Sequence, residues 1–210
     1  MTAKRLPLAL ACSLSILAVA CQGPTRGSSP MDGASPPSEA DMADMMERMT
    51  ELATPGAEHA RLDALVGTFH ADLTMWNAPG LEPETMTGTM VNSWIMGGRF
   101  VQSDYSSEWM GQPFYGMGLF GYDKLQGAYM GTWCDTFSTW LAPLGVGQLS
   151  EDGNRIVTHK DMVDPMSGLL NHVREVLTFV NDDHHRHEMY TSSEEQDEYL
   201  MMRIEYKRTR

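Results

Sequence analysis

Apolar and polar residues alternate along most of the chain after its first third, and a period of two residues is the pattern of a half-buried β-strand. The first such stretch is Thr68–Trp76, and one of its faces carries Phe69, Ala71, Leu73 and Met75. Turn signals such as "APGLEPE" and "SEDGN" separate the later stretches. The other predicted strands are Thr85–Met96, Arg99–Trp109, Gly111–Asp123, Ala128–Asp135, two around Gln148 and Arg155, Val173–Val180, His187–Ser192 and Tyr199–Arg208.

These nine or ten strands follow one another through short turns with no helix between them, which predicts an antiparallel meander. An open sheet of so many strands would expose two long edges, and closure into a barrel removes both. We therefore predict an all-β fold, a single antiparallel up-and-down β-barrel that occupies residues 67–210.

The stretch "GQPFYGMGLFGYD" has two glycines in the middle of a predicted strand. Gly116 and Gly118 share a face with Phe114 and Phe120. Glycine weakens a strand, so its presence here needs a local reason. Two reasons are open: the barrel wall bends sharply at this point, or the bare backbone leaves floor space for a ligand.

Residues 39–66 have the features of a short helical segment, which we expect to cap the barrel. Acidic residues follow a candidate N-cap at Ser38, and Pro55 with Gly56 ends the first helix. A second helical piece ends at Gly67.

The first of these helices has a stripe of methionines at helical spacing, namely Met42, Met45, Met46 and Met49. One interpretation is a thioether site for Cu(I), because soft sulfur ligands suit that ion. The other is an apolar stripe that docks on the domain. We favour docking because methionine is common throughout the chain, with 18 residues.

The N-terminus has the features of a bacterial secretion signal. Lys4 and Arg5 precede an apolar run of about fifteen residues, which is too short to span a bilayer comfortably. The run ends in "LAVAC", which resembles a lipobox and implies cleavage before Cys21 and lipid attachment to its thiol. Ordinary signal cleavage after Ala20 is the alternative. We predict a signal peptide over residues 1–20 and a lipid-anchored disordered linker over residues 21–38, which is rich in Gly, Ser and Pro.

The charge of the chain argues against a nucleic-acid partner. The formal net charge is −13, and loss of Lys4 and Arg5 with the signal peptide takes it to about −15. Lipid at Cys21, rather than charge, would therefore hold the protein at a membrane. We expect a lipoprotein of the bacterial cell envelope, on the periplasmic side. Gln22 is not the Asp that favours retention at the inner membrane, so the outer membrane is the preferred assignment.

After removal of the signal peptide the chain has two cysteines, Cys21 and Cys134. If Cys21 carries lipid, Cys134 has no partner, and no disulfide framework supports the fold. Cys134 lies in an apolar strand without a nearby base or electropositive surround, so we interpret it as a small buried hydrophobic residue and not as a reactive thiol.

Several motifs in order resemble those of the bacterial family called domain of unknown function 1579. They are "PGAEHARLDALVGTF", "IMGGRFVQSDY", "MGQPFYGMGLFGYD", "WCDTFST" and "NDDHHRHEMY", and the resemblance covers residues 41–210. The family resembles the calycin group of barrels, which includes lipocalins, fatty-acid-binding proteins and nitrobindin-like haem proteins. The resemblance implies a barrel with an interior cavity, and it implies no activity.

Motifs for catalysis are absent from the sequence, which contains no "GxSxG", P-loop, dinucleotide fingerprint or "HExxH". His184, His185 and His187 invite a zinc interpretation, since the last two share a face of a strand. They lie beside a polar turn without a visible third ligand, so we interpret them as a solvated hairpin tip. We assign no catalytic residue, no metal ligand and no cofactor.

Aromatic and methionine side chains on the predicted strands are the stronger lead, because they line pockets for apolar ligands as well as filling cores. We hypothesise that the barrel binds a small, partly apolar molecule in its interior without catalysis. The predicted ligand-binding residues are Arg99, Tyr105, Tyr115, Trp133 and Glu188. The alternatives are an enzyme that uses the same cavity, and a structural or partner-binding envelope lipoprotein with a filled barrel.

Overall fold

The computed structural model describes residues 36–165 and 167–209. The predicted signal peptide, Cys21 and most of the predicted linker lie outside the described residues. The chain divides into two units, and the barrel lies in the second, Ala43–Arg210. No helix among the described residues has the length and apolar character that a membrane span requires.

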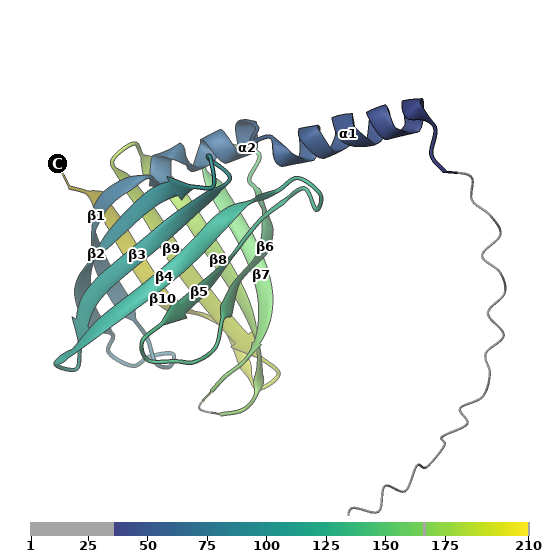
Figure 1. Ribbon diagram of the computed structural model, residues 1–210. Coiled ribbons are helices and arrows are strands. Elements are labelled where there is room, and N and C mark those ends of the chain that lie inside the picture. Colours follow the sequence, from purple (N-terminus) through teal and green to yellow (C-terminus); the bar gives the residue numbers. More distant parts are fainter. Residues whose placement is uncertain (1–35, 166, 210) are drawn as a thin grey trace, which may run out of the picture. The chain divides into compact units, whose positions relative to one another are not determined.

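Ten antiparallel strands form a closed barrel, which confirms the predicted fold class (Figure 1). Each strand pairs with its neighbours in the chain, and β1 pairs with β10 to close the sheet. The strands are β1 (Gly67–Met75), β2 (Glu84–Ile95), β3 (Phe100–Trp109), β4 (Gln112–Asp123), β5 (Ala128–Asp135), β6 (Ala142–Leu149), β7 (Arg155–Val163), β8 (Leu170–Asn181), β9 (His184–Ser193) and β10 (Gln196–Arg208).

The alternation of the sequence sets which face of each strand points into the barrel. On β1, Phe69 and Ala71 are fully buried, whereas Thr68 and His70 between them are exposed. The register places Phe69 opposite Met90 of β2 and Leu73 opposite Met86. Apolar residues of neighbouring strands therefore meet on the inner face, as a period of two requires.

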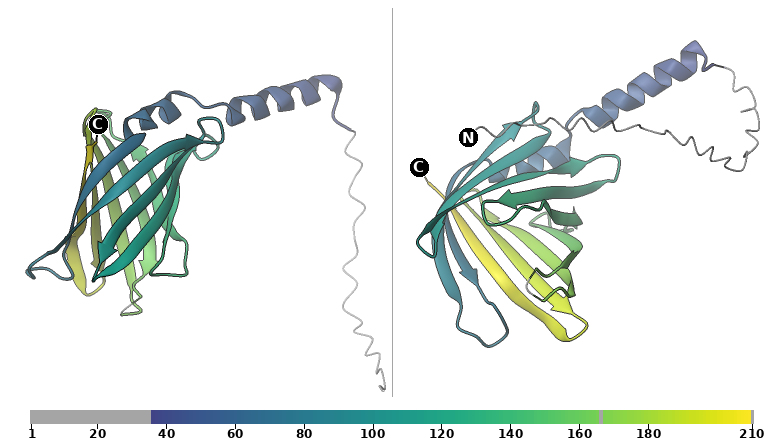
Figure 2. Two further views of the ribbon diagram at one scale, coloured as in Figure 1. Left: turned by 60° about the vertical axis from the view of Figure 1, so that its left-hand side comes forward. Right: turned by 60° about the horizontal axis from the view of Figure 1, so that its bottom comes forward.

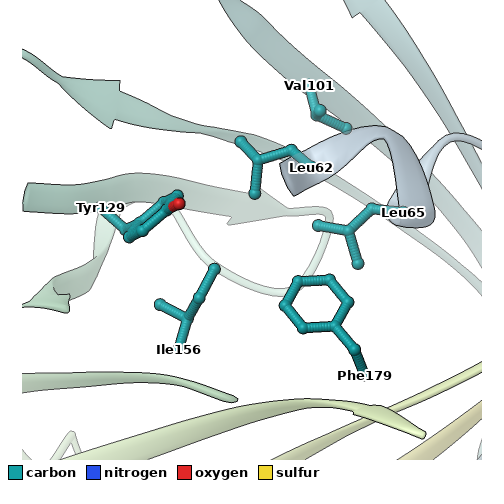
Figure 3. Packing of buried hydrophobic residues seen from close by; sticks show 6 residues of the cluster. All are labelled: Leu62, Leu65, Val101, Tyr129, Ile156 and Phe179. Carbon is teal, nitrogen blue, oxygen red and sulfur yellow. The ribbon is translucent and has the colours of Figure 1, made fainter. Parts of the chain in front are cut away.

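Two short helices cap one end of the barrel (Figure 2). These are α2 (Ala57–Ala60) and the 3₁₀ helix η1 (Arg61–Leu65). Leu62 and Leu65 of η1 pack into a buried cluster with residues of four strands (Figure 3). The strand residues of this cluster are Val101, Tyr129, Ile156 and Phe179.

Hydrogen bonds tie the cap to the barrel at the same end. The Asn92 side-chain amide donates to the carbonyl of Leu65 over 2.8 Å, and the Tyr129 hydroxyl donates to the carbonyl of Glu58 over 3.0 Å. The Arg208 guanidinium donates to the carbonyls of Ala64 and Val66 over 3.1 and 2.6 Å. The carbonyls at the end of η1 thus have partners, which a buried helix terminus requires.

The first helix, α1 (Glu39–Ala53), buries none of its residues. The four methionines of its stripe are 47–61% exposed. The residues that pack against the end of the barrel belong to α2 and η1, and docking of the methionine stripe stays a prediction.

Cys134 lies on the outer face of β5, where it is only half-buried and its thiol lies 3.8 Å from the carbonyl oxygen of Met117. The interpretation of Cys134 as a buried hydrophobic residue is corrected accordingly. Trp133 and Asp135 on either side of it line the barrel interior, and the alternation of the strand turns Cys134 outward.

Candidate functional site: the barrel cavity

The barrel is hollow, with an interior cavity of about 730 Å³. All ten strands contribute side chains to its wall, and most of these side chains are apolar. Methionines line it from four strands, at Met75, Met86, Met90, Met189 and Met202.

The cavity is closed at one end and reaches the surface at the other. Leu65 of η1 lines the capped end. At the opposite end, Phe137 and Trp140 of the loop between β5 and β6 line the cavity while they are 46% and 51% exposed. A ligand would therefore enter between the loops that lie opposite the cap.

Aromatic rings form a continuous cluster on the wall made by β3, β4 and β5. Tyr105 lies 5.9 Å from Phe114 and 6.4 Å from Trp133, measured between ring centroids. Towards the mouth, Trp109 stacks on Phe137 with centroids 5.0 Å apart. We call these five residues the aromatic wall.

Gly116 and Gly118 of β4 make room for Trp133, which answers the question raised by the sequence. A Cβ atom at Gly116 would lie 2.0 Å from Cζ2 of Trp133, and one at Gly118 would lie 3.3 Å from its Cε3. The glycines thus serve a close approach of an indole ring to the backbone. Gly118 and Trp133 both line the cavity, so this close packing is part of the cavity wall.

An ionic cluster lies on β7, β8 and β9, which are different strands from those of the aromatic wall. The Lys160 ammonium pairs with Oε1 of Glu175, and both side chains are 6% exposed. The same ammonium donates to the carbonyl of Pro143 over 2.6 Å. Nε2 of His187 lies 3.4 Å from Oε2 of Glu175.

These contacts keep Glu175 ionised. Burial raises the pKa of its carboxyl, but the hydrogen bond and charge of His187, together with those of Lys160, more than offset burial and leave the pKa below its usual value. The cluster is therefore a compensated ion pair in an apolar wall, which is the condition under which charges persist in a protein interior.

His185 also lines the cavity, two residues before His187 on the same face of β9. Its ring stacks on Tyr206 with centroids 4.7 Å apart and meets the edge of Phe69 at 4.6 Å. Burial, assisted by the positive charges of His187, Arg208 and His184, lowers the pKa of His185 to about 3. The imidazole is therefore neutral at physiological pH.

The interpretation of the three histidines as a solvated hairpin tip is wrong for two of them. The turn occupies Asp182 and Asp183, and β9 already begins at His184. His184 points outward and bonds Glu205 over 2.6 Å, whereas His185 and His187 point inward. Among the described residues, no group of three or more His, Cys, Asp or Glu is arranged to hold a metal ion.

Two of the five predicted ligand-binding residues, Tyr105 and Trp133, line the cavity. Arg99, Tyr115 and Glu188 do not belong to its lining. Their role in binding a ligand was predicted from residue type. Whether such a residue can contact a ligand in the cavity depends on whether its side chain lies on the inner or the outer face of the barrel.

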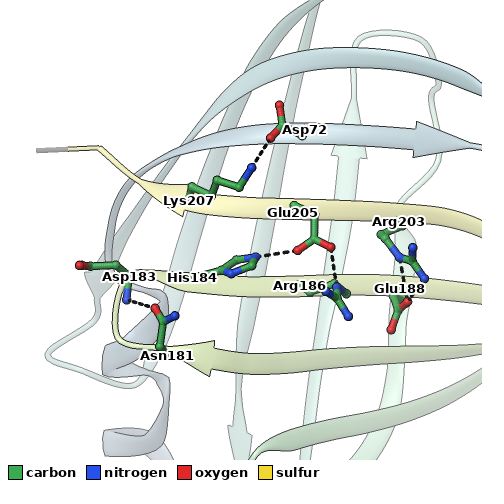
Figure 4. A network of polar contacts seen from close by, with 9 residues as sticks. All are labelled: Asp72, Asn181, Asp183, His184, Arg186, Glu188, Arg203, Glu205 and Lys207. Atoms are coloured by element: carbon green, nitrogen blue, oxygen red, sulfur yellow. Dashed lines mark hydrogen bonds and ion pairs between the residues drawn. The ribbon is translucent and has the colours of Figure 1, made fainter.

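Each of these three residues is directed away from the interior for a local reason. Arg99 lies in the turn between β2 and β3 and donates to the carbonyl of Met96 over 2.9 Å. Tyr115 occupies the outer face of β4 and is 58% exposed. Glu188 lies on the outer face of β9, where Arg203 pairs with it at 2.7 Å beside other polar contacts of β9 and β10 (Figure 4).

Sequence reasoning missed Lys160, and it considered Glu175 as a strand charge that would need a partner if it faced inward but did not select it as a ligand-binding residue. Both lie at inward-facing positions of their strands. Lys160 is four residues after buried Ile156, and Glu175 is two residues after buried Val173. That parity was the available signal, but a charged residue at an inward position is identified only once its partner on the next strand is known.

These features define a hollow, antiparallel up-and-down barrel that is capped at one end. Residues 54–208 match the family described as protein of unknown function DUF1579, and the chain belongs to that family. No curated protein sequence matches the chain.

Two solved structures match the chain at low sequence identity. The structure of Rv2717c from M. tuberculosis matches with a TM-score of 0.53 and 14% identity, over 75% of this chain and 100% of that chain. The S-type phycobiliprotein lyase CPES from Guillardia theta matches with a TM-score of 0.49 and 11% identity, over 74% of this chain and 99% of that chain. At 14% identity the likeness to Rv2717c concerns the fold alone.

Proposed function

We propose that this protein binds one small, partly apolar molecule inside its barrel and carries out no chemistry on it. The observation that carries the proposal is the cavity of about 730 Å³, with its aromatic wall and its methionines. Ligand pockets for small molecules have volumes of roughly 300–1,000 Å³ and mostly apolar linings with a few polar groups. A filled barrel with a purely structural role does not fit such a volume.

A pair of substitutions on one strand tests this proposal. Ser103 of β3 lines the cavity, whereas Ser106 of the same strand is exposed. Ser103→Phe would place a ring in the cavity, and Ser106→Phe would place the same ring in solvent. With the apolar dye Nile red as probe, we expect fluorescence titration to show binding that Ser103→Phe weakens at least about tenfold, a loss of about 1.4 kcal/mol. Equal affinities for the two variants would refute binding in the barrel.

We further propose that lipid on Cys21 holds the protein in the bacterial cell envelope, on the periplasmic side and preferentially at the outer membrane. The support is the sequence alone: a charged start, a short apolar run and "LAVAC". Metabolic labelling with a fatty-acid analogue tests it. We expect label on the wild-type protein and none on Cys21→Ala, and label on both would contradict the assignment.

Catalysis in the same cavity is the second candidate, and the cluster of Lys160, Glu175 and His187 is the observation that favours it. Its groups are paired in a way that weakens their reactivity. The carboxylate of Glu175 has a lowered pKa, which makes it a poor base, and the ammonium of Lys160 has that carboxylate as its partner. A chromogenic ester panel distinguishes the candidates: turnover by the wild type that Glu175→Gln abolishes would favour an enzyme.

A further inference from the structure

We infer that the cavity selects an uncharged ligand that carries a hydrogen-bonding group, and that the imidazole of His185 binds this group. The inference rests on the proposed function, because it names the class of molecule that the same cavity takes. Three features of the cavity support it: an unpaired buried imidazole, a compensated ion pair and a carboxylate at the mouth.

The imidazole of His185 is held in place but has no hydrogen-bond partner. The residue is 4% exposed, and its ring is fixed between Tyr206 and Phe69. Its Nδ1 atom is buried without a hydrogen bond, and no hydrogen bond to the ring occurs among residues 36–165 and 167–209. The ring nevertheless lines the cavity.

A buried polar group without a partner costs roughly 1–3 kcal/mol, so its presence requires a reason. The packing of the ring does not supply one, since a phenyl ring would stack on Tyr206 equally well. His187, the other histidine of the wall, has Glu175 as its partner. A ligand with a hydroxyl or a carbonyl group would satisfy one nitrogen of His185, because neutral imidazole offers one donor and one acceptor.

The charges of the cavity are already compensated, which disfavours a charged ligand deep inside. Both oxygens of Glu175 have partners, in Lys160 and His187. The ammonium of Lys160 bonds Glu175 and the carbonyl of Pro143. An anionic ligand group would compete with Glu175 for the ammonium of Lys160, and a cationic ligand group would be repelled by that ammonium. Either group would therefore be buried at a desolvation cost.

The mouth of the cavity disfavours anions in addition. Asp135 lines it there, and its carboxylate accepts hydrogen bonds from the indole of Trp133 over 3.1 Å and from the backbone of Phe137 over 2.9 Å. No Lys, Arg or His of the described residues forms an ion pair with Asp135. An anion entering the barrel would therefore pass an unneutralised carboxylate, on a chain whose net charge is −13.

Four probes with one ring system test the inference by isothermal titration calorimetry on the intact protein at neutral pH. Naphthalene has no hydrogen-bonding group, naphthol is uncharged with one hydroxyl, naphthoate is an anion and naphthylmethylammonium is a cation. We expect naphthol to bind most tightly, about tenfold or more above either ion, which corresponds to about 1.4 kcal/mol. A tighter fit of either ion would overturn the inference, although the proposed function would stand.

Two histidine variants locate the hydrogen bond. His185→Phe keeps the ring stacked and removes its nitrogens, and we expect a loss of about three- to tenfold in naphthol affinity with naphthalene affinity unchanged, as the loss of one hydrogen bond predicts. His70→Phe, on the exposed face of β1, is the control and should alter neither. An unchanged ratio of naphthol to naphthalene affinity in His185→Phe would overturn the role of His185. Failure of all four probes to bind the wild type would instead refute the proposed function itself, and the inference with it.

Discussion

Gly88 and Gly116 have no side chain at the two points where large rings of the cavity wall approach a neighbouring strand. A Cβ atom at Gly88 would lie 2.4 Å from the hydroxyl oxygen of Tyr105, and one at Gly116 would lie 2.0 Å from the indole of Trp133. The positions of Tyr105 and Trp133 in the aromatic wall therefore each depend on a glycine of the adjacent strand, which is a stronger constraint than strand propensity.

Gly116→Ala should disturb the wall through Trp133. The added methyl group overlaps the six-membered ring of the indole, and overpacking of this kind costs about 1–3 kcal/mol of unfolding free energy. Trp133→Phe removes the part of the ring that clashes, so the same glycine substitution should cost less in that background. Urea denaturation of the four proteins measures the coupling, and additive effects of the two substitutions would contradict the seating of Trp133 on Gly116.

Lys160→Met should be strongly destabilising, because it leaves Glu175 buried with only His187 as its partner. Removal of one member of a buried pair costs about 3–5 kcal/mol, and Lys160→Met with Glu175→Leu should recover most of it. Lys207→Met is the matched control, since Lys207 pairs with Asp72 at the surface and such pairs contribute about 1 kcal/mol or less. Chemical denaturation measures the loss of unfolding free energy in each variant. A larger loss in Lys207→Met than in Lys160→Met would show that Lys160 and Glu175 are not a compensated buried pair.

The buried imidazole of His185 predicts a loss of stability on mild acidification. Its pKa is about 3 in the folded protein against 6.5 for the ordinary group, so the unfolded chain binds more protons between these values. Stability is therefore complete above about pH 6.5 and falls as the pH drops towards 3, by about 2 kcal/mol between pH 7 and pH 5.

Denaturation curves at several pH values check this. Burial also lowers the pKa of His59, so His185→Phe should keep only a smaller dependence in the same window. The carboxylates with lowered pKa values, Glu175 among them, lose their contribution at lower pH, below about 4.5. A dependence between pH 7 and pH 5 that is the same in His185→Phe as in the wild type would contradict the burial of a neutral imidazole.

At the scale of elements, η1 closes one end of the barrel with two leucines. Leu62→Ala should destabilise the protein by about 2–5 kcal/mol, because Leu62 is fully buried against strands that cannot all move inward. Leu125→Ala is the control, since Leu125 is 74% exposed in the turn between β4 and β5. Equal thermal unfolding midpoints for the two variants would refute the role of η1 as a packed cap.

The alternation along the strands predicted the elements well and the site only in part. Thr68–Trp76 and Gly111–Asp123 closely match β1 and β4, because one apolar face per strand is enough to define a strand. The same parity places Tyr115 outside, opposite in face to Phe114. Its prediction as a ligand-binding residue gave residue type more weight than parity.

Pairs across strands were beyond prediction from one sequence. The contact of Lys160 with Glu175 depends on the register between β7 and β8, which places Thr158 opposite Glu175 and Lys160 opposite Val173. That register depends on the conformation of the turn that joins the two strands, and a shift of one residue would move every side chain of one strand to the other face. The position of Glu188 likewise depends on a partner across strands, since Arg203 of β10 pairs with it on the outer face.

The whole molecule is a hollow barrel with one closed end and one open end, and its wall carries aromatic rings on some strands and a compensated ion pair on others. The closed end gives the cavity a fixed depth, and the open end gives a ligand its route. A binding protein needs both features, whereas a structural barrel needs neither.

Native mass spectrometry of the protein isolated from the cells that naturally produce it tests binding inside the barrel. We predict the mass of the protein plus one uncharged small molecule, lost on denaturation, absent from Ser103→Phe and retained in Ser106→Phe. A wild-type protein with no added mass, or an added mass that persists in Ser103→Phe, would contradict binding inside the barrel.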